Sequence, residues 1–333
     1  MTHTYKMKIN LTFLALLCFM LAQAQDPIFT QYFMAPQALN PGYTGFMETT
    51  HVGLLHRTQW PDADLKINSD YAFINAWSED MNSGFGLSFL SQRESFTNYN
   101  LNQANASYAY KVQLESDWYF IPGIEVGFGT KSYGFQNLIL EDQLNIGTGT
   151  IDGTSIDPVG VRDKINFFDV SAGMVVHNDN AFVGVALKHL NKPNISFTNI
   201  GNIPLDMFLS VNAGYEFMVS DYNDFLPNNT KLLFTSSFMM QGDYNRLDVG
   251  TGLIFSRFFF GAIAATNPSR NNPNSHLLTS INGFGGLQYE HFKFGYSYDF
   301  NVSGIGRTGG IHEFSLTYHF DLAAKCFGCP QYE

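Results

Sequence analysis

Two cysteines close to the end of the chain have a spacing that suggests chemistry. Cys326 and Cys329 form the sequence Cys-Phe-Gly-Cys, after the last segment that we expect to be a strand. In an oxidising compartment, the simplest outcome for such a pair is a local disulfide. A redox site would need a thiol pKa lowered at a helix N-terminus, and no helix is indicated here. Zinc would need four ligands, so two cysteines alone predict no metal site.

No other local pattern predicts catalysis or a cofactor. The histidines are scattered, without a His-Glu-x-x-His sequence or a close pair at metal-ligand spacing. No Gly-x-Ser-x-Gly sequence is present, so a serine hydrolase is not supported. Residues 304–309 satisfy Gly-x-Gly-x-x-Gly, but they fall in an expected hairpin loop with no helix after it, so dinucleotide binding is not indicated. We therefore expect no enzyme, no cofactor and no metal ion.

An acidic stretch with several glycines spans residues 135–166. It contains Glu141, Asp142, Asp152 and Asp157. These carboxylates could bind calcium, but their spacing does not fit an EF-hand. We expect a loop that binds a partner, and a plain surface loop is the alternative that the sequence leaves open.

Composition limits the classes of protein that could carry these residues. The chain of 333 residues contains 32 Phe, 17 Tyr and 3 Trp, and only 14% of its residues are charged, against about 25% in ordinary soluble proteins. Disorder is excluded because it goes with few aromatic residues and a high charge density. A net charge of −11 disfavours nucleic acid as a partner, because phosphate binding needs clustered Lys and Arg. A large folded β protein or a membrane barrel remains.

The start of the chain predicts a secretory signal peptide. Lys6 and Lys8 precede an apolar run at residues 11–21, and Ala22-Gln23-Ala24 supplies the small-x-small cleavage pattern. The run of 11 residues is too short to span a bilayer as a helix, which needs about 20. Cleavage after Ala24 removes two lysines and no acids, so the formal charge changes from −11 to −13. We expect the mature chain to leave the cytoplasm.

Period-two alternation runs through the rest of the chain. Between residues 291 and 300, aromatic residues stand at every even position, and polar residues or glycine stand at every odd position. Such alternation fits strands with one apolar face and one polar face. Turn residues divide the chain into fourteen expected strands, near residues 49–60, 66–77, 83–92, 102–113, 118–134, 167–177, 181–189, 207–218, 230–241, 244–256, 258–266, 276–289, 291–300 and 311–320.

These features together predict an all-β, transmembrane outer-membrane barrel of about fourteen antiparallel strands. Soluble sandwiches favour strands of about five or six residues, whereas barrel strands have about ten residues of alternating hydrophobicity. If both termini are periplasmic, the two longest connections, 135–166 and 190–206, face outside, and only the 219–229 connection is unexpectedly long on the inner side. The expected order is a signal peptide at 1–24, an N-terminal segment at 25–48, the barrel at 49–320 and a periplasmic tail at 321–333.

The sequence after the signal peptide resembles that of a known family. It reads Gln-Asp-Pro-Ile-Phe-Thr-Gln-Tyr at residues 25–32, Asn-Pro-Gly-Tyr at 40–43 and Arg-Thr-Gln-Trp at 57–60. These stretches closely resemble the QDPxxTQY start, the NPAYAG-like turn and the RxQW strand of the PorP/SprF family of type IX secretion system membrane proteins, with Gly42 in place of the usual Ala. The ending Cys-Pro-Gln-Tyr at 329–332 is similar to the family's Cys-Pro-Arg-Phe. The motif residues that we expect in the lumen or in a plug are Asp26, Pro27, Gln31, Tyr32, Asn40, Pro41, Arg57, Gln59 and Trp60.

The resemblance implies an outer-membrane protein of Bacteroidota that is not an enzyme. Members are tied to type IX secretion and gliding motility, and an SprF-like role in motility is among those implied. The family is linked to a large cell-surface adhesin with a type B C-terminal domain, which the barrel would help export or anchor. A second implied contact is with the periplasmic lipoprotein ring of the secretion machine. The alternative function is a passive channel, or a transporter of hydrophobic substrates with residues 25–45 as a hatch.

Two features near the start of the barrel bear on its lumen. Residues 25–45 hold three prolines and precede the first expected strand, so they are either a plug in the barrel mouth or a periplasmic lead-in. Gly53, Arg57 and Gln59 share one face of that strand, which we expect to face the lumen. Lys66 and Asp70 are candidates to lie beside them. A buried Arg–acid network that braces the lumen is favoured over a ligand site.

Overall fold

The structure is a computed structural model that describes residues 26–63, 65–134, 144–145, 150–151, 162–198, 201–219, 227, 230–269, 277–302 and 308–320. The expected signal peptide, Cys326 and Cys329, and the loop acids Glu141, Asp142, Asp152 and Asp157 lie outside these residues. Within the described ranges, the helices are two short 3-10 turns, η1 (Pro36–Ala38) and η2 (Pro41–Tyr43). Neither has the length or the apolar character that crossing a membrane requires.

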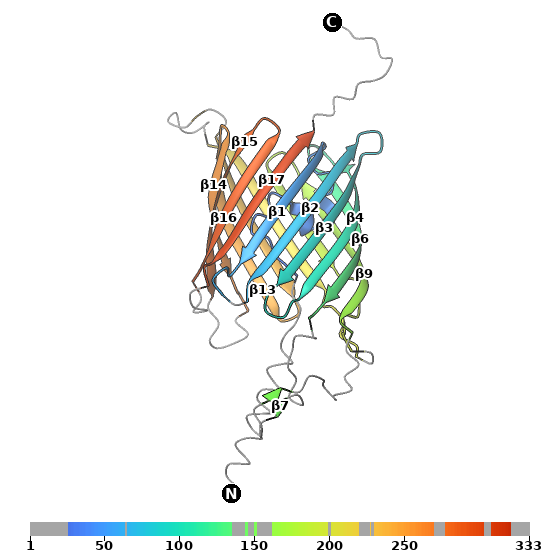
Figure 1. Cartoon of the computed structure of the whole chain (residues 1–333). Helices are drawn as coiled ribbons and strands as arrows, with labels where there is room; N and C mark the ends of the chain where they lie inside the picture. Colours follow the sequence, from blue (N-terminus) through green and yellow to red (C-terminus); the bar gives the residue numbers. More distant parts are fainter. Residues whose placement is uncertain are drawn as a thin grey trace.

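Fourteen long antiparallel strands close into a barrel (Figure 1). Closure is made by β1 (Thr50–Gln59) and β17 (Ile311–Phe320), which pair along their whole length. The other long strands are β2 (Ile67–Ser78), β3 (Ser83–Glu94), β4 (Asn100–Tyr110), β6 (Tyr119–Ser132), β9 (Lys164–His177), β10 (Ala181–Lys188), β11 (Phe208–Met218), β12 (Lys231–Gln241), β13 (Tyr244–Phe255), β14 (Phe258–Thr266), β15 (Leu278–Tyr289) and β16 (Phe292–Asn301). Three two-residue strands are also described, β5 (Val112–Gln113), β7 (Leu144–Asn145) and β8 (Thr150–Ile151). The predicted outer-membrane barrel is confirmed, and its strands lie close to the expected ranges.

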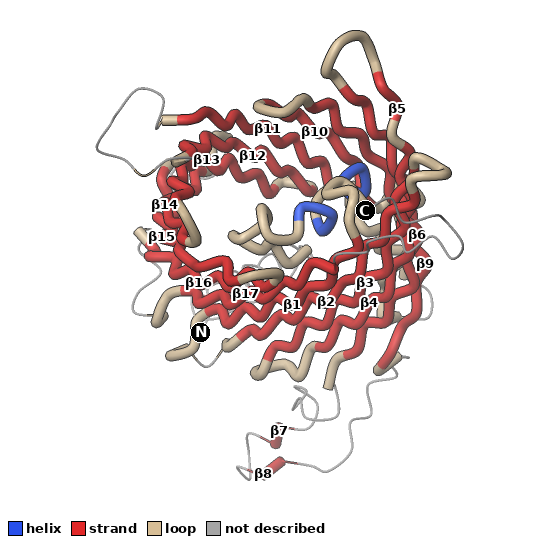
Figure 2. Tube along the Cα trace, turned by 90° about the horizontal axis from the view of Figure 1, so that it is seen from above, coloured by secondary structure: helices blue, strands red, loops and turns tan. Residues whose placement is uncertain are grey.

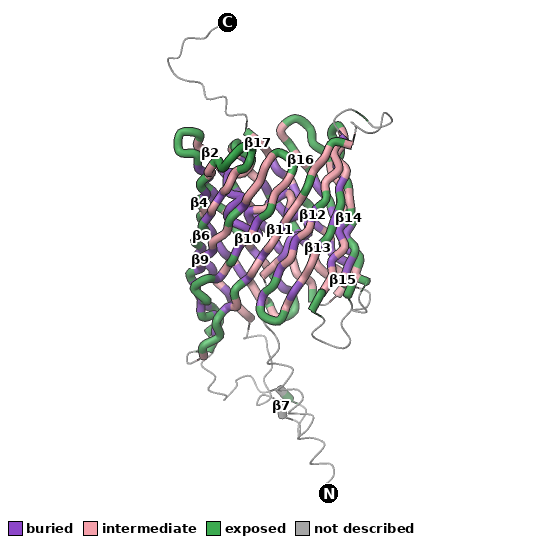
Figure 3. Tube along the Cα trace, turned by 180° about the vertical axis from the view of Figure 1, so that it is seen from behind, coloured by how far each residue is buried: buried purple, intermediate pink, exposed green. Residues whose placement is uncertain are grey.

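The two faces of the wall carry different side chains. Along the strands, buried residues alternate with more exposed ones (Figure 3). The outward rows are dominated by large apolar side chains such as Leu54, Phe89 and Phe314, which are exposed and suit a lipid environment. The inward rows are less polar than we expected, because Leu55 and Phe73 are also buried on the luminal side.

The N-terminal residues 26–48, called the luminal segment below, lie inside the barrel. Viewed along the barrel axis, the two short helices sit within the ring of strands (Figure 2). The segment begins beside His189 and Gln241, at the end of the barrel that carries the 133–163 and 189–207 connections, called the loop end. It leads into β1 at Thr50, which pairs with Phe320 at the opposite end of the barrel, called the turn end. The segment therefore passes through the lumen from one end to the other.

The apolar core lies between the luminal segment and the wall. One cluster joins Ile28, Tyr32 and Leu39 of the segment to Phe208, Met239 and Ile263 of the wall. A second joins Phe29 and Ala35 to Leu55, Tyr71 and Phe73, and a third joins Tyr43 to Ala109, Ile121 and Val175. Because buried apolar area stabilises by about 25 cal/mol per Å², the burial of these side chains stabilises the segment in addition to its hydrogen bonds. They also explain why inward rows of the wall carry apolar residues.

Candidate functional site

Glu313 of β17 holds the first turn of the luminal segment. Its carboxylate accepts hydrogen bonds from the backbone N–H groups of Thr30 (3.0 Å) and Gln31 (2.7 Å). The Gln31 side chain completes the contact, because its Nε2 donates to the Glu313 carbonyl at 3.0 Å and its Oε1 accepts from the Ser315 hydroxyl at 2.7 Å. Glu313 and Gln31 are both almost fully buried. A carboxylate with two backbone donors is well satisfied without water.

Arg57 of β1 lies beside this anchor. Its Nη1 is 3.4 Å from a carboxylate oxygen of Glu313 and 3.3 Å from the Thr30 hydroxyl, which in turn donates to Asp299 at 3.0 Å. Its Nη2 donates to Gln59 at 3.4 Å. The guanidinium therefore supplies positive charge to a buried group of carboxylates on β16 and β17. This is an Arg–acid network in the lumen, and it binds the segment as well as the wall.

Asp70 does not belong to that network, so the expectation that it lies in the lumen is wrong. The pairing of β1 with β2 sets Asp70 directly opposite His56, and both side chains point outward. A shift of one residue in register moves a side chain to the other face of a sheet, and the sequence does not specify register to that precision. Lys66 precedes β2 at the loop end, where its backbone N–H donates to Ser95 at 3.2 Å.

His189 ties the beginning of the luminal segment to the wall. Its Nε2 is 2.7 Å from Asp26 and its Nδ1 is 2.9 Å from Asp169, so the ring bridges two carboxylates. Burial alone would lower the pKa of His189, but the Asp26 charge and the bonds to both carboxylates raise it to about 9. Burial alone would raise the pKa of Asp26, but the charge and hydrogen bond of His189, together with the charges of Lys188 and Lys131, lower it well below its usual range. The backbone N–H of Asp26 adds a bond to Gln241 at 2.9 Å.

Asn40 forms the central contact of the segment. Its side-chain oxygen accepts from the Gly42 backbone N–H at 2.8 Å and caps η2, in which Pro41 is the first residue. Its Nδ2 donates to the Met174 carbonyl at 3.0 Å, on β9. Asn40 is fully buried, so a residue that lacks these two contacts would leave polar groups unpaired.

At two glycines of the wall, the backbone of the segment lies directly against the backbone of the strands. A Cβ atom at Gly123 would lie 2.5 Å from the Pro41 carbonyl oxygen, and one at Gly84 would lie 2.1 Å from the Thr44 carbonyl oxygen. Both distances are far shorter than a real Cβ contact. The wall is therefore shaped around residues 41–44 of the segment.

Further polar contacts continue along the segment. The Lys188 ammonium donates to the Ala38 carbonyl at 3.1 Å, and the Ser210 hydroxyl donates to the Leu39 carbonyl at 3.0 Å. The Tyr43 hydroxyl donates to Asn212 at 3.2 Å. The Tyr32 hydroxyl is 3.2 Å from Thr235. The anchors therefore come from strands on several sides of the barrel.

The segment does not fill the lumen completely. A cavity of about 470 Å³ remains toward the loop end, and its lining includes Pro27, Gln59, Trp60, Arg246 and Asp299. The Arg246 side chain is only 11% exposed, and its Nε donates to Asp248 at 2.7 Å. In the described part of the chain, no group of three or more His, Cys, Asp or Glu side chains is arranged to hold a metal ion.

The motif residues are thus largely brought together by the structure, but the residues that hold them were missed. Asp26, Gln31, Tyr32, Asn40 and Pro41 all contact the wall in the lumen. Their partners are charged or polar residues on inward rows, principally Glu313, Asp299, Asp169 and Lys188, together with His189 directly after β10. The sequence signal that could have identified these partners is an acidic or basic residue on the polar row of an alternating strand.

The fold and the site define a class of protein, an outer-membrane β-barrel whose lumen is occupied by its own N-terminal segment. The chain belongs to the PorP/SprF family, because the family model described as "Type IX secretion system membrane protein PorP/SprF" matches residues 21–318. The resemblance of the N-terminal motifs is thereby confirmed. As a membrane component of that system, the protein works with the secretion machinery and the bilayer, and neither fold nor family is that of a known enzyme class.

Solved structures with a similar fold are outer-membrane barrels. The CymD monoaromatic hydrocarbon channel has 15% sequence identity and a TM-score of 0.50, covering 86% of this chain and 93% of its own. The P. putida toluene transporter TodX has 11% identity and a TM-score of 0.47, with coverages of 85% and 94%. A Pseudomonas aeruginosa FadL homologue has 11% identity and a TM-score of 0.45, with coverages of 84% and 93%. No curated protein matches the chain.

Proposed function

We propose that this barrel binds a secreted substrate of the type IX system and helps to export it or hold it at the cell surface. The expected substrate is a large gliding adhesin with a type B C-terminal domain. Family membership carries this proposal, because the PorP/SprF match extends over nearly the whole chain. The role is one of binding, and it requires no catalytic step in the lumen.

The luminal segment supports a barrel that is closed at rest. Its bonds to Glu313, His189 and Met174 tie it to opposite parts of the wall, and its apolar side chains fill the space between them. A closed barrel suits a protein that presents a binding surface, because no open pore is then left in the membrane. The loop end, with the 133–163 and 189–207 connections, is the end that we expect to face outside and to meet the adhesin. The turn end would then face the periplasmic lipoprotein ring.

Co-purification tests the proposal directly. A tagged type B C-terminal domain is expressed in cells that carry the barrel, and complexes are isolated from intact envelopes. We expect the barrel to be enriched with the tagged domain and not with a matched domain of another type. Equal recovery with both domains would contradict the proposal. Removal of residues 190–206 should reduce the enrichment if the loop end carries the contact.

A passive channel for hydrophobic substrates is the second candidate. The observation that favours it is the cavity beside the luminal segment, since displacing residues 26–45 would join that space to both ends of the lumen. Single-channel conductance in a reconstituted bilayer separates the two functions. A barrel that stays closed, and takes up no hydrocarbon into vesicles, leaves the binding role; regular openings without co-purification favour the channel.

A further inference from the structure

A polar cluster interrupts the lipid-facing wall of the barrel. The side chains of His56 and Asp70 are 49% and 56% exposed, and they lie among the outward rows that carry Leu54, Phe89 and Phe314. Arg or Lys on the lipid face of a barrel costs about 2–4 kcal/mol at the midplane and about 0–1 kcal/mol near the interfaces, and acidic side chains cost less. His56 lies three positions before Gln59, the last residue of β1, so the cluster is displaced toward the loop end. This position lowers the free-energy cost of placing His56 and Asp70 on the lipid face, but it does not explain how the two side chains are arranged.

The cluster has a definite order of hydrogen bonds. The Asp70 carboxylate is 2.7 Å from Nδ1 of His56, and the opposite ring nitrogen, Nε2, is 3.1 Å from the hydroxyl of Thr58. His56 and Thr58 are two positions apart on β1 and therefore share its outward face. Asp70 reaches the same face from β2, directly opposite His56 in register. The result is a chain of carboxylate, imidazole and hydroxyl.

This order is that of a nucleophilic triad. In such a triad, the carboxylate fixes the tautomer and orientation of the imidazole, the imidazole removes the hydroxyl proton, and the oxygen attacks an acyl carbon. The constellation is recognised by geometry and role, not by fold or by chain position. The separations of 2.7 and 3.1 Å fall within the range expected for a nucleophile and its base. We propose that Thr58, His56 and Asp70 form a lipid-facing acyl-transfer centre that hydrolyses acyl esters of membrane lipids.

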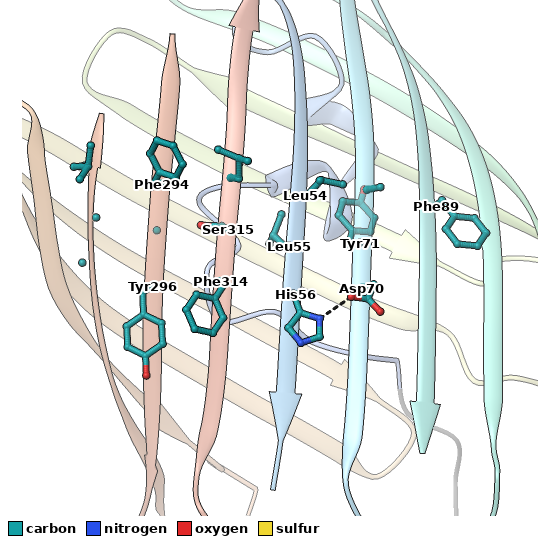
Figure 4. A pocket seen from close by; sticks show the side chains of 16 residues that line it. Leu54, Leu55, His56, Asp70, Tyr71, Phe89, Phe294, Tyr296, Phe314 and Ser315 are labelled. Atoms are coloured by element: carbon teal, nitrogen blue, oxygen red, sulfur yellow. Dashed lines mark hydrogen bonds and ion pairs between the residues drawn. The ribbon is translucent and has the colours of Figure 1, made fainter. Parts of the chain in front are cut away.

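An apolar hollow beside the triad supports the choice of substrate. The hollow has a volume of about 600 Å³, and its lining includes Leu54, Phe89 and Phe314 together with His56 and Asp70 (Figure 4). Figure 4 shows the His56–Asp70 pair on two neighbouring strands, with Phe314 on one side of it and Phe89 on the other. An acyl chain that lies along the wall would place its ester beside the polar cluster. The hydroxyl of Thr58 would then face the ester carbonyl from the same side of the sheet.

The reaction uses only the lipid ester and water. The Thr58 oxygen bonds to the acyl carbon as His56 takes the hydroxyl proton on Nε2, and the bond from the acyl carbon to the lipid alcohol then breaks. His56 returns the proton to the departing alkoxide, which leaves an acyl ester of Thr58. Water attacks this ester with His56 again as the base, and releases the fatty acid and free Thr58. In the structure the Thr58 hydroxyl donates to Oδ1 of Asn68 at 3.0 Å, so the hydroxyl has to rotate toward Nε2 of His56 before its proton is removed.

The branched hydroxyl of Thr58 gives the proposal a distinctive test. A serine at this position keeps the bond to His56 and removes the methyl group that crowds the attacking oxygen. Purified full-length protein is reconstituted into phosphatidylethanolamine vesicles, and the release of free fatty acid is measured over time. We expect the Thr58→Ser variant to release fatty acid at least as fast as wild type. His56→Gln and Thr58→Val should lower the rate at least a hundredfold, since general-base catalysis contributes about 10²–10⁴.

Two controls separate catalysis from structure. Thr251→Val removes an exposed threonine from the outer face of β13, which does not carry His56 or Asp70. It should leave the rate of fatty-acid release unchanged. An organophosphonate probe should label wild type and Thr58→Ser, with the adduct at residue 58 by mass spectrometry, and should not label His56→Gln. Circular dichroism verifies that each variant retains its β structure. Equal fatty-acid release from wild type and Thr58→Val, or no release above empty vesicles, would overturn the proposal and leave a polar contact surface for a membrane partner.

This activity is independent of the proposed role in secretion. Thr58→Val leaves the luminal segment and the loop end intact, so it should not change co-purification with the adhesin domain. Loss of adhesin binding with unchanged fatty-acid release would therefore count against the proposed function alone. Loss of release with unchanged adhesin binding is the result expected from the triad variants.

Discussion

Removal of the Glu313 carboxylate should release the first turn of the luminal segment. In a Glu313→Ala variant, the backbone N–H groups of Thr30 and Gln31 lose their acceptor, and Arg57 loses its nearest carboxylate. Hydrogen bonds to a charged group are worth about 1.5–3 kcal/mol each, and breaking a buried ion pair costs about 3–5 kcal/mol. These terms overlap because they share one carboxylate. We therefore expect the segment to lose about 4 kcal/mol of binding to the wall, which raises its released population about a thousandfold.

Amide hydrogen exchange of the barrel in bilayer discs measures this release. Peptides that cover residues 26–34 should exchange much faster in Glu313→Ala, whereas peptides from β9 and β12 should keep their protection. Glu313→Gln retains one acceptor oxygen and should have a smaller effect. Glu216→Gln is the matched control, because its carboxylate bonds Lys231 on the neighbouring strand at 2.6 Å. Unchanged exchange at Thr30 and Gln31 in a folded Glu313→Ala barrel would refute the reasoning.

Three further outcomes are expected. Because the pKa of His189 is raised, its contribution to stability is complete below its usual pKa of 6.5 and is lost as pH rises through about 9. Because the pKa of Asp26 is lowered, its contribution to stability is present above its usual pKa of 3.8 and is lost as pH falls below that value. Exchange at residues 26–30 should therefore be slowest between about pH 3.8 and pH 6.5. Exchange that does not change with pH, after correction for the intrinsic rate, would contradict the proposed contribution of the Asp26–His189 contact. Gly123→Ala should destabilise the barrel by about 1–3 kcal/mol in urea unfolding because its Cβ meets the segment, while Gly283→Ala, where a Cβ has open space, should have no such cost. Leu54→Arg places a charge on the lipid face and should cost up to about 2–4 kcal/mol in the same assay, a loss that should disappear when detergent replaces the bilayer.

The strands could be predicted from the sequence because their signal is local. Alternation along residues 291–300 and turn residues such as Asn178-Asp179-Asn180 mark the strands and their ends within a short window. The closed barrel then follows from the number and length of the strands. Loop lengths predict the sidedness from the same local signal, and that prediction stays untested. None of these steps depends on which residues meet across the lumen.

The position of the luminal segment could not be obtained in this way. Thr30 and Glu313 are 283 positions apart, and no local pattern connects them. The apolar residues Leu55 and Phe73 on inward rows look the same in the sequence as lipid-facing ones, although they pack against the segment. The triad was missed for a related reason, because His56 and Thr58 are visible as neighbours on one face but Asp70 joins them only through the register of β1 and β2.

The anchor of the luminal segment has a consequence for how the barrel is assembled. Arg57 and Glu313 are direct partners across the seam between β1 and β17, the first and the last strand of the barrel. The site that grips Thr30 and Gln31 therefore comes into existence only when the final strand has paired with the first. An incompletely inserted chain lacks this anchor, although the contacts of Asp26 with His189 and of Asn40 with Met174 do not need the seam. Protection of Thr30 and Gln31 thus reports that the seam has closed, and a protease that cuts at these residues would recognise barrels whose last strand never paired.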